Sequence, residues 1–143
     1  MHNDPSVVYL GMLKEWLEKE AKNDDIKEFI VFEGGYLLFT ILAETERLQR
    51  GEGLFMKRIR ILQIVQLLLD KQQEKQINFD IMDNILNIRD SITTIFFNIS
   101  AVNVEITWLV LNILIKLFYA KEASYRFFLT AIKEYKREFK TKY

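Results

Sequence analysis

The stretch that decides the fold is FIVFEGGYLLFTIL, residues 29–42. Its two apolar runs are separated by Gly34 and Gly35, which predicts one helix ending at Glu33 and a second beginning at Tyr36. Glycine leaves a helix in the left-handed conformation at no steric cost, so we expect a sharp corner at the two glycines. Two apolar helices at a sharp angle cannot bury their faces alone. Further helical layers must stack on them, as in a binding scaffold built from repeats.

The composition agrees with a helical protein of one domain. Of the 143 residues, 50% are hydrophobic and 28% are charged, and there are one proline, five glycines and no cysteine. The formal net charge is zero, which argues against a nucleic-acid binder, because phosphate recognition needs a basic excess. The opening MHNDPS shows no secretory signal, and the apolar segment 107–120 is too short to span a bilayer. We therefore expect a soluble cytoplasmic protein.

Capping residues and apolar spacing predict the remaining helices. Asp4-Pro5 starts the first helix, and Asn23-Asp24 stops it and caps the next. The buried face of the first helix is expected to carry the residues that recur at three- and four-residue steps: Tyr9, Leu10, Leu13, Trp16, Leu17 and Ala21. Further helices are expected at residues 36–50, 54–71, 79–88, 92–99, 103–119 and 122–140, with residues 71–76 as a linker. No alternating run is bounded by hairpin turns, so no β-structure is expected.

Two parts of the chain resemble each other. YLLFTILAETERL followed by FMKRIRILQIVQLLLD is similar to SITTIFFNIS followed by NVEITWLVLNILIKLFY. Each part is a shorter helix, a break and a longer, more apolar helix. This pattern predicts an all-α, armadillo-like helical solenoid of about two repeats with a leading helical element. The last of these helices is expected to be nearly buried, with one polar line at Glu105, Asn112 and Lys116.

In this order, the helices resemble the N-terminal regulatory region of a diaphanous-related formin, where a GTPase-binding segment leads into armadillo repeats. The residues that carry the resemblance are Pro5, Tyr9, Leu13, Leu17, Asn23, Asp24, Phe29, Phe32, Gly34, Gly35 and 37–42, with 111–119 and 128–135 near the other end. The sequence departs from the family at Ile26, where a tryptophan is expected, and at Lys116, where the family has a small residue.

The resemblance implies a module that binds an activated Rho-family GTPase and controls actin assembly through autoinhibition, in the cytoplasm and associated with the cytoskeleton. Residues 1–35 would be the GTPase-binding lead and residues 36–143 the armadillo-like repeats. The GTPase contacts implied by the family fall on Asn23 and Asp24, with Lys22 and Lys27 beside them. An autoinhibitory helix would lie in a groove whose matching stretch runs from Lys116 to Tyr119.

A generic armadillo or HEAT scaffold is an alternative. Peptide-binding armadillo proteins use a Trp-x-x-x-Asn pair, which Trp108 and Asn112 reproduce once, with Glu105 and Lys116 in line. The plainer interpretation is a tryptophan at the edge of the core beside an exposed asparagine. Asn23-Asp24 likewise has a plain interpretation as a helix stop and cap. A small helical ligand-binding bundle is a third reading, because Phe and Ile are abundant.

Catalysis is not expected. The only histidine is His2, and no carboxylate pair lies in an apolar stretch that would separate an acid from a base. We expect neither a metal site nor a cofactor. A solenoid without polar end caps often dimerises through its exposed end, so a homodimer is among the expected assemblies.

Overall fold

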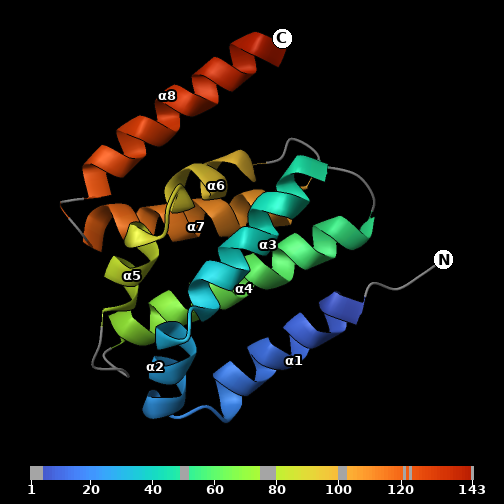
Figure 1. Ribbon diagram of the computed structural model, residues 1–143, viewed down its shortest axis with the longest axis vertical. Helices are drawn as coiled ribbons and strands as arrows, with labels where there is room; N and C mark the ends of the chain where they lie inside the picture. Colours follow the sequence, from blue (N-terminus) through green and yellow to red (C-terminus); the bar gives the residue numbers. More distant parts are fainter. Residues whose placement is uncertain are drawn as a thin grey trace.

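The computed structural model of the chain describes residues 5–48, 52–74, 80–99, 103–120, 122 and 124–142. Within these ranges the chain forms eight α-helices and no strand, which confirms the predicted all-α fold (Figure 1). The helices are α1 (Pro5–Lys19), α2 (Asn23–Val31), α3 (Gly34–Leu48), α4 (Glu52–Gln73), α5 (Ile81–Asn87), α6 (Ser91–Phe97), α7 (Val104–Ala120) and α8 (Ser124–Lys142). Three residues named in the sequence analysis lie outside the described residues: His2 and the predicted helix starts Asp4 and Phe79.

The helices are arranged around α4. In Figure 1, α1 lies along one side of α4 and α7 along the other, and both pack against it. Helix α3 packs on α4 and on α6, and α6 in turn packs on α7 and α8. The pair α3 and α4 therefore lies against the pair α6 and α7. These are the two segments whose sequences resemble each other.

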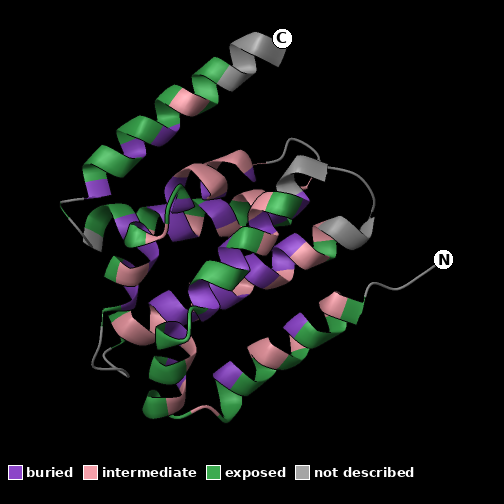
Figure 2. Ribbon diagram, viewed as in Figure 1, coloured by how far each residue is buried: buried purple, intermediate pink, exposed green. Residues whose placement is uncertain are grey.

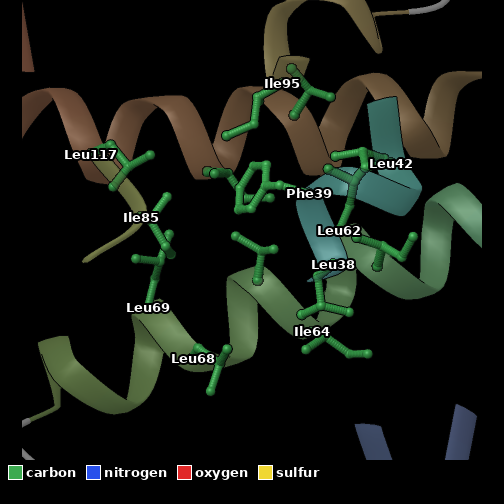
Figure 3. Packing of buried hydrophobic residues seen from close by; sticks show 14 of the residues in the cluster. Leu38, Phe39, Leu42, Leu62, Ile64, Leu68, Leu69, Ile85, Ile95 and Leu117 are labelled. Carbon is green, nitrogen blue, oxygen red and sulfur yellow. The ribbon is translucent and has the colours of Figure 1, made fainter. Parts of the chain in front are cut away.

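The core is one continuous cluster with α4 at its centre. Buried residues gather along α4 and on the helix sides that face it (Figure 2). Leu62 and Leu69 of α4 meet Phe39 of α3 and Leu117 of α7 between these helices, as Figure 3 shows. Ile64 lies on the side of α4 nearer to α1. Several neighbouring helices therefore cover α4.

The corner between α2 and α3 lies where the sequence predicts it, but for a different reason. The left-handed residue is Glu33, with φ 65°, and Gly34 and Gly35 are the first residues of α3. A Cβ on Gly34 would lie 2.5 Å from the Phe29 ring and 2.6 Å from the Phe29 carbonyl oxygen. Gly34 is therefore required for the close approach of α2 to α3, and Glu33 makes the turn.

Several sequence predictions about helix ends and faces are wrong. The residue that caps α2 is Lys22, so Asn23 and Asp24 lie inside its first turn. The negative charge of Asp24 there interacts favourably with the helix dipole. On α1, Leu10 and Leu17 are buried as predicted, whereas Tyr9 is 68% exposed and Trp16 37% exposed.

The predicted linker at residues 71–76 begins instead as the last turn of α4. The Gln72 side chain explains this extension, because it connects α4 to the start of α5. Its amide donates to Asp80 Oδ1 at 2.9 Å, and its oxygen accepts the Met82 N–H at 2.7 Å. These bonds hold the end of α4 against the capped start of α5, where the Asp83 N–H donates to Asp80.

Two buried polar side chains mark the ends of α6. At the carboxyl end, Arg58 of α4 donates from Nε to Asn98 Oδ1 at 2.7 Å and from Nη2 to the Asn98 carbonyl oxygen at 3.3 Å. This guanidinium therefore caps a helix end that carries partial negative charge. At the amino end, Ser91 is also buried, and its hydroxyl has no hydrogen-bond partner among the described residues.

None of the described helices combines the length and apolar character needed to cross a membrane.

Substitutions at the α2–α3 corner will separate the two roles. We expect Gly34→Ala to destabilise the protein by about 1–3 kcal/mol, because the Phe29 carbonyl cannot move aside. Glu33→Gly should stabilise it by about 1 kcal/mol by relieving the left-handed conformation. Urea unfolding followed by circular dichroism measures both. Gly35→Ala is the control, because its Cβ would meet only the movable side chains of Ile88 and Asn84; equal losses at both glycines would contradict this account.

The two buried polar groups of α6 should respond oppositely to truncation. Asn98→Ala leaves the buried Arg58 guanidinium short of an acceptor and should cost about 2–4 kcal/mol. Ser91→Ala removes a hydroxyl without a partner and should change stability by less than about 1 kcal/mol, in the stabilising direction. The same unfolding experiment compares them, and a larger loss for Ser91→Ala than for Asn98→Ala would refute the assignment.

Candidate functional site

The four predicted GTPase-contact residues lie at the start of α2 and are all exposed. Lys22 is the N-cap residue, and its backbone N–H donates to Asp25 Oδ2 at 2.9 Å. Asn23 and Asp24 follow in the first turn, and Lys27 lies one turn later. Because Asp25 makes the capping bond, neither Asn23 nor Asp24 is used as the cap. The prediction that Asn23 and Asp24 cap α2 is therefore wrong, and both residues lie in an exposed turn.

An exposed apolar group follows directly on the same helix. Val31 is 64% exposed, and Phe32, the residue that ends α2, is 81% exposed. Across the turn, Tyr36 and Leu37 are 57% and 58% exposed on the first turn of α3. Four large apolar side chains within seven residues, all more than half exposed, form a patch that the core of the protein does not use.

Polar and apolar residues share one face of α2 at the corner. Asp24, Lys27 and Val31 are spaced by three and four residues, which places them on one face of α2. The opposite face carries Ile26 and Ile30, which are buried in the core. We define the corner surface as Lys22, Asn23, Asp24, Lys27, Val31, Phe32, Tyr36 and Leu37. It has an apolar centre with charged residues at one end, which is the general composition of a protein–protein interface.

Sequence reasoning missed the apolar half of the corner surface. The sequence predicts Phe32 inside a helix that ends at Glu33, but α2 ends at Val31 and Phe32 is 81% exposed. The signal was present in the spacing. Ile26 and Ile30 already supply the buried line at a four-residue interval, so Val31 and Phe32 fall outside it.

The five predicted groove residues of α7 do not form one equivalent set. Glu105, Trp108 and Tyr119 are exposed, Trp108 by 63% and Tyr119 by 81%. Asn112 is half-buried. Lys116 forms an ion pair with Asp70 of α4, so its charge is already matched within the protein. Of the polar line, Lys116 therefore contributes to the contact between α7 and α4, whereas Glu105 is exposed.

Helix α7 is not the nearly buried rod that its composition predicts. Ile106, Val110, Ile113 and Leu117 are buried against the neighbouring helices. The other side of the helix exposes a second set of apolar residues: Val104, Trp108, Leu111, Ile115, Phe118 and Tyr119. One apolar side is enough to join α4 and α6, and on the other side, among the described residues, Phe118 alone has a ring contact with another helix, at 5.2 Å from the Phe128 ring of α8. Composition alone cannot separate a helix buried all round from one with a buried and an exposed apolar side.

The described residues offer little for small-molecule chemistry. A hollow of about 360 Å³ lies between the α5–α6 turn and α8, lined on the α8 side by Phe127 and Thr130. On the turn, Arg89 and Asp90 are paired with each other at 3.7 Å. No group of three or more His, Cys, Asp or Glu residues in the described ranges is placed to hold a metal ion.

Comparison with known proteins finds no match for this chain among protein-family models, curated proteins or solved structures.

The pairing of Lys116 with Asp70 can be measured by a double-mutant cycle. Both side chains are partly exposed, at 20% and 37%, so we expect a coupling energy of about 0.5–1 kcal/mol between Asp70→Asn and Lys116→Met. The coupling should fall at high salt, because partly exposed charges are screened. Strictly additive losses from the two substitutions would show that the α7 lysine is free to meet a partner.

Proposed function

We propose that this chain is a protein-interaction module of the formin regulatory type, with an armadillo-like arrangement of helices, and that it binds the GTP form of a Rho-family GTPase through the corner surface. In this proposal the chain acts as a binding scaffold and not as an enzyme. The observation that carries it is the position of Lys22, Asn23, Asp24 and Lys27. All four are exposed, and a patch of four exposed apolar residues adjoins them on the same corner.

The packing of the helix pairs supports the armadillo-like part of the proposal. In a solenoid each repeat contacts its neighbours, and equivalent helices of successive repeats lie side by side. Here α4 packs on α7 and α3 packs on α6, which pairs the equivalent helices of the two similar segments. Helix α1 packs on α4 in turn, so the leading element continues the same layer.

The composition of the corner surface supports a protein partner. Interfaces derive most of their affinity from a few buried aromatic and aliphatic side chains, while charged residues at the rim steer association. Phe32 and Tyr36 supply aromatic side chains, and Lys22 and Lys27 supply positive charge at the rim for an acidic and polar partner surface. Contacts from the polar residues Asn23 and Asp24 alone would bury little apolar area in a complex.

The formin-type proposal includes release of an inhibitory segment when the GTPase binds. Such coupling requires that the GTPase and the segment favour different arrangements of the module, because a ligand with equal affinity for both arrangements shifts nothing. The sharp α2–α3 corner, fixed by Glu33 and Gly34, joins the corner surface to the helix that packs on α4 and α6. It is the direct physical connection between a ligand on α2 and the rest of the core.

Nucleotide-dependent binding tests the proposal. Purified Rho-family GTPases, loaded with GDP or with a non-hydrolysable GTP analogue, are titrated against the chain by isothermal calorimetry. We expect binding to the GTP-loaded form only. Phe32→Asp should weaken it at least about tenfold, because it places a charge at the apolar centre. Lys27→Glu should weaken it less and make it less sensitive to salt.

Matched controls lie on α8, away from the corner. Tyr125→Asp and Lys133→Glu change an exposed aromatic and an exposed lysine side chain and should leave GTPase affinity unchanged. Equal binding of the GDP and GTP forms, or equal losses from the corner and α8 substitutions, would refute the proposal.

A further inference from the structure

The exposed apolar side of α7 is a second surface that the GTPase proposal does not use. We define the α7 stripe as Val104, Trp108, Leu111, Ile115, Phe118 and Tyr119, which are between 42% and 81% exposed. They recur at intervals of four, three, four and three residues along the whole helix, with Tyr119 beside Phe118. That interval places them on one face, opposite the buried Ile106, Val110, Ile113 and Leu117.

The size of the α7 stripe matches one side of a stable interface. An aromatic side chain buries roughly 150–250 Å² when fully covered, and three of the six residues are aromatic. The stripe therefore exposes on the order of 600–800 Å², which exceeds the largest apolar patch of most monomers and approaches the roughly 800 Å² per partner of a standard interface. Helix α8 begins near the carboxyl end of α7 and diverges from it (Figure 1). Phe118, at that end of the stripe, packs on Phe128 of α8, whereas Val104, Trp108 and Ile115 are each more than half exposed.

The order of residues in the α7 stripe is complementary to itself in the antiparallel direction. When a second α7 is laid antiparallel, with the two-fold axis between positions 111 and 112, Trp108 of each copy faces Ile115 of the other. In the same register, Val104 faces Tyr119 and Leu111 lies beside its own copy. A large ring therefore meets an aliphatic side chain on either side of the axis and two leucines meet at the axis itself, which suits close packing across a two-fold axis.

The charges around the α7 stripe are also compatible with a second copy. Lys116 is already paired with Asp70, and Glu105 lies at the far end from the axis, so two copies bring no like charges together at the centre. Asn112 lies at the edge of the stripe next to the axis. A single polar residue at such a position favours one register, because other registers would leave its amide against apolar side chains.

We propose that this protein forms a two-fold symmetric, antiparallel dimer through the α7 stripe. The partner is a second copy of the chain, since the stripe presents a matching surface to itself in both residue order and charge. The dimer is independent of GTPase recognition: it uses α7, whereas the corner surface belongs to α2 and α3.

Paired charge substitutions test the interface and its register. Sedimentation equilibrium of the unmodified chain in the micromolar range should give twice the monomer mass of 17.1 kDa. Trp108→Lys and Ile115→Glu should each give monomers, because each buries unpaired charges at two symmetric places. The double variant should recover the dimer, since every lysine at 108 then faces a glutamate at 115 of the other copy. Tyr125→Lys, which changes a 57% exposed residue of α8, is the control and should remain dimeric.

Cysteine cross-linking tests the same register without adding charge, because the chain has no cysteine of its own. Leu111→Cys should form a covalent dimer on mild oxidation, since the two copies lie beside each other at the axis. Val104→Cys should not, because the two copies are about 20 Å apart along the helices at 1.5 Å rise per residue, far beyond the reach of a disulfide.

Far-UV circular dichroism confirms that each variant is folded, as expected for substitutions at exposed positions. An unmodified chain that remains a 17.1 kDa monomer over this range, including one that binds an unrelated helix in the stripe, overturns the proposal. A double variant no more dimeric than the single ones, or cross-linking of Val104→Cys as efficient as that of Leu111→Cys, overturns it as well.

Discussion

The need to cover α4 governs this structure. The helix has 22 residues, and Ile61, Leu62, Ile64, Val65, Leu68 and Leu69 on it are each at most 1% exposed. These side chains point over nearly half of the circumference, and Ile59, which is 4% exposed, widens the buried side further. Each contributes about 1.5–3 kcal/mol only when it is fully covered. One neighbouring helix cannot cover them all. Helices α1 and α7 on the two sides, with α3 and α5 packed against the same helix, satisfy this requirement.

The parts of the fold that follow from local chemistry were predictable from the sequence. Asn103 was expected to start a helix, and its Oδ1 accepts the Ile106 N–H at 3.0 Å. Apolar spacing placed every helix near its observed position because each has at least one side that must be buried. Tyr9 and Trp16 were assigned to the wrong side for the same reason. The three- and four-residue spacing placed Tyr9 and Trp16 on the same apolar side as Leu10 and Leu17, but only the two leucines are buried where α1 packs on α4.

The candidate sites were less predictable, because they depend on contacts between distant residues. Lys116 was expected to face a partner, yet its charge is matched by Asp70, forty-six positions earlier in the chain. The apolar half of the corner surface depends on where α2 ends, and that point is set by the left-handed Glu33, a residue type that gives no warning of such a turn. The sequence alone does not distinguish an exposed apolar residue from a buried one, so surfaces of this kind become visible only in three dimensions.

The corner surface and the α7 stripe can be occupied at the same time. The corner surface lies on α2 and α3 and the α7 stripe on α7, and Figure 1 shows α2 and α7 well separated. A dimer built through α7 therefore leaves both copies of the corner surface free. Two copies related by a two-fold axis would bind a clustered partner with an effective concentration set by the dimer itself, without any new contact. Binding would then be sensitive to the density of the activated partner as well as to its nucleotide state, because a single partner molecule gains nothing from the second corner.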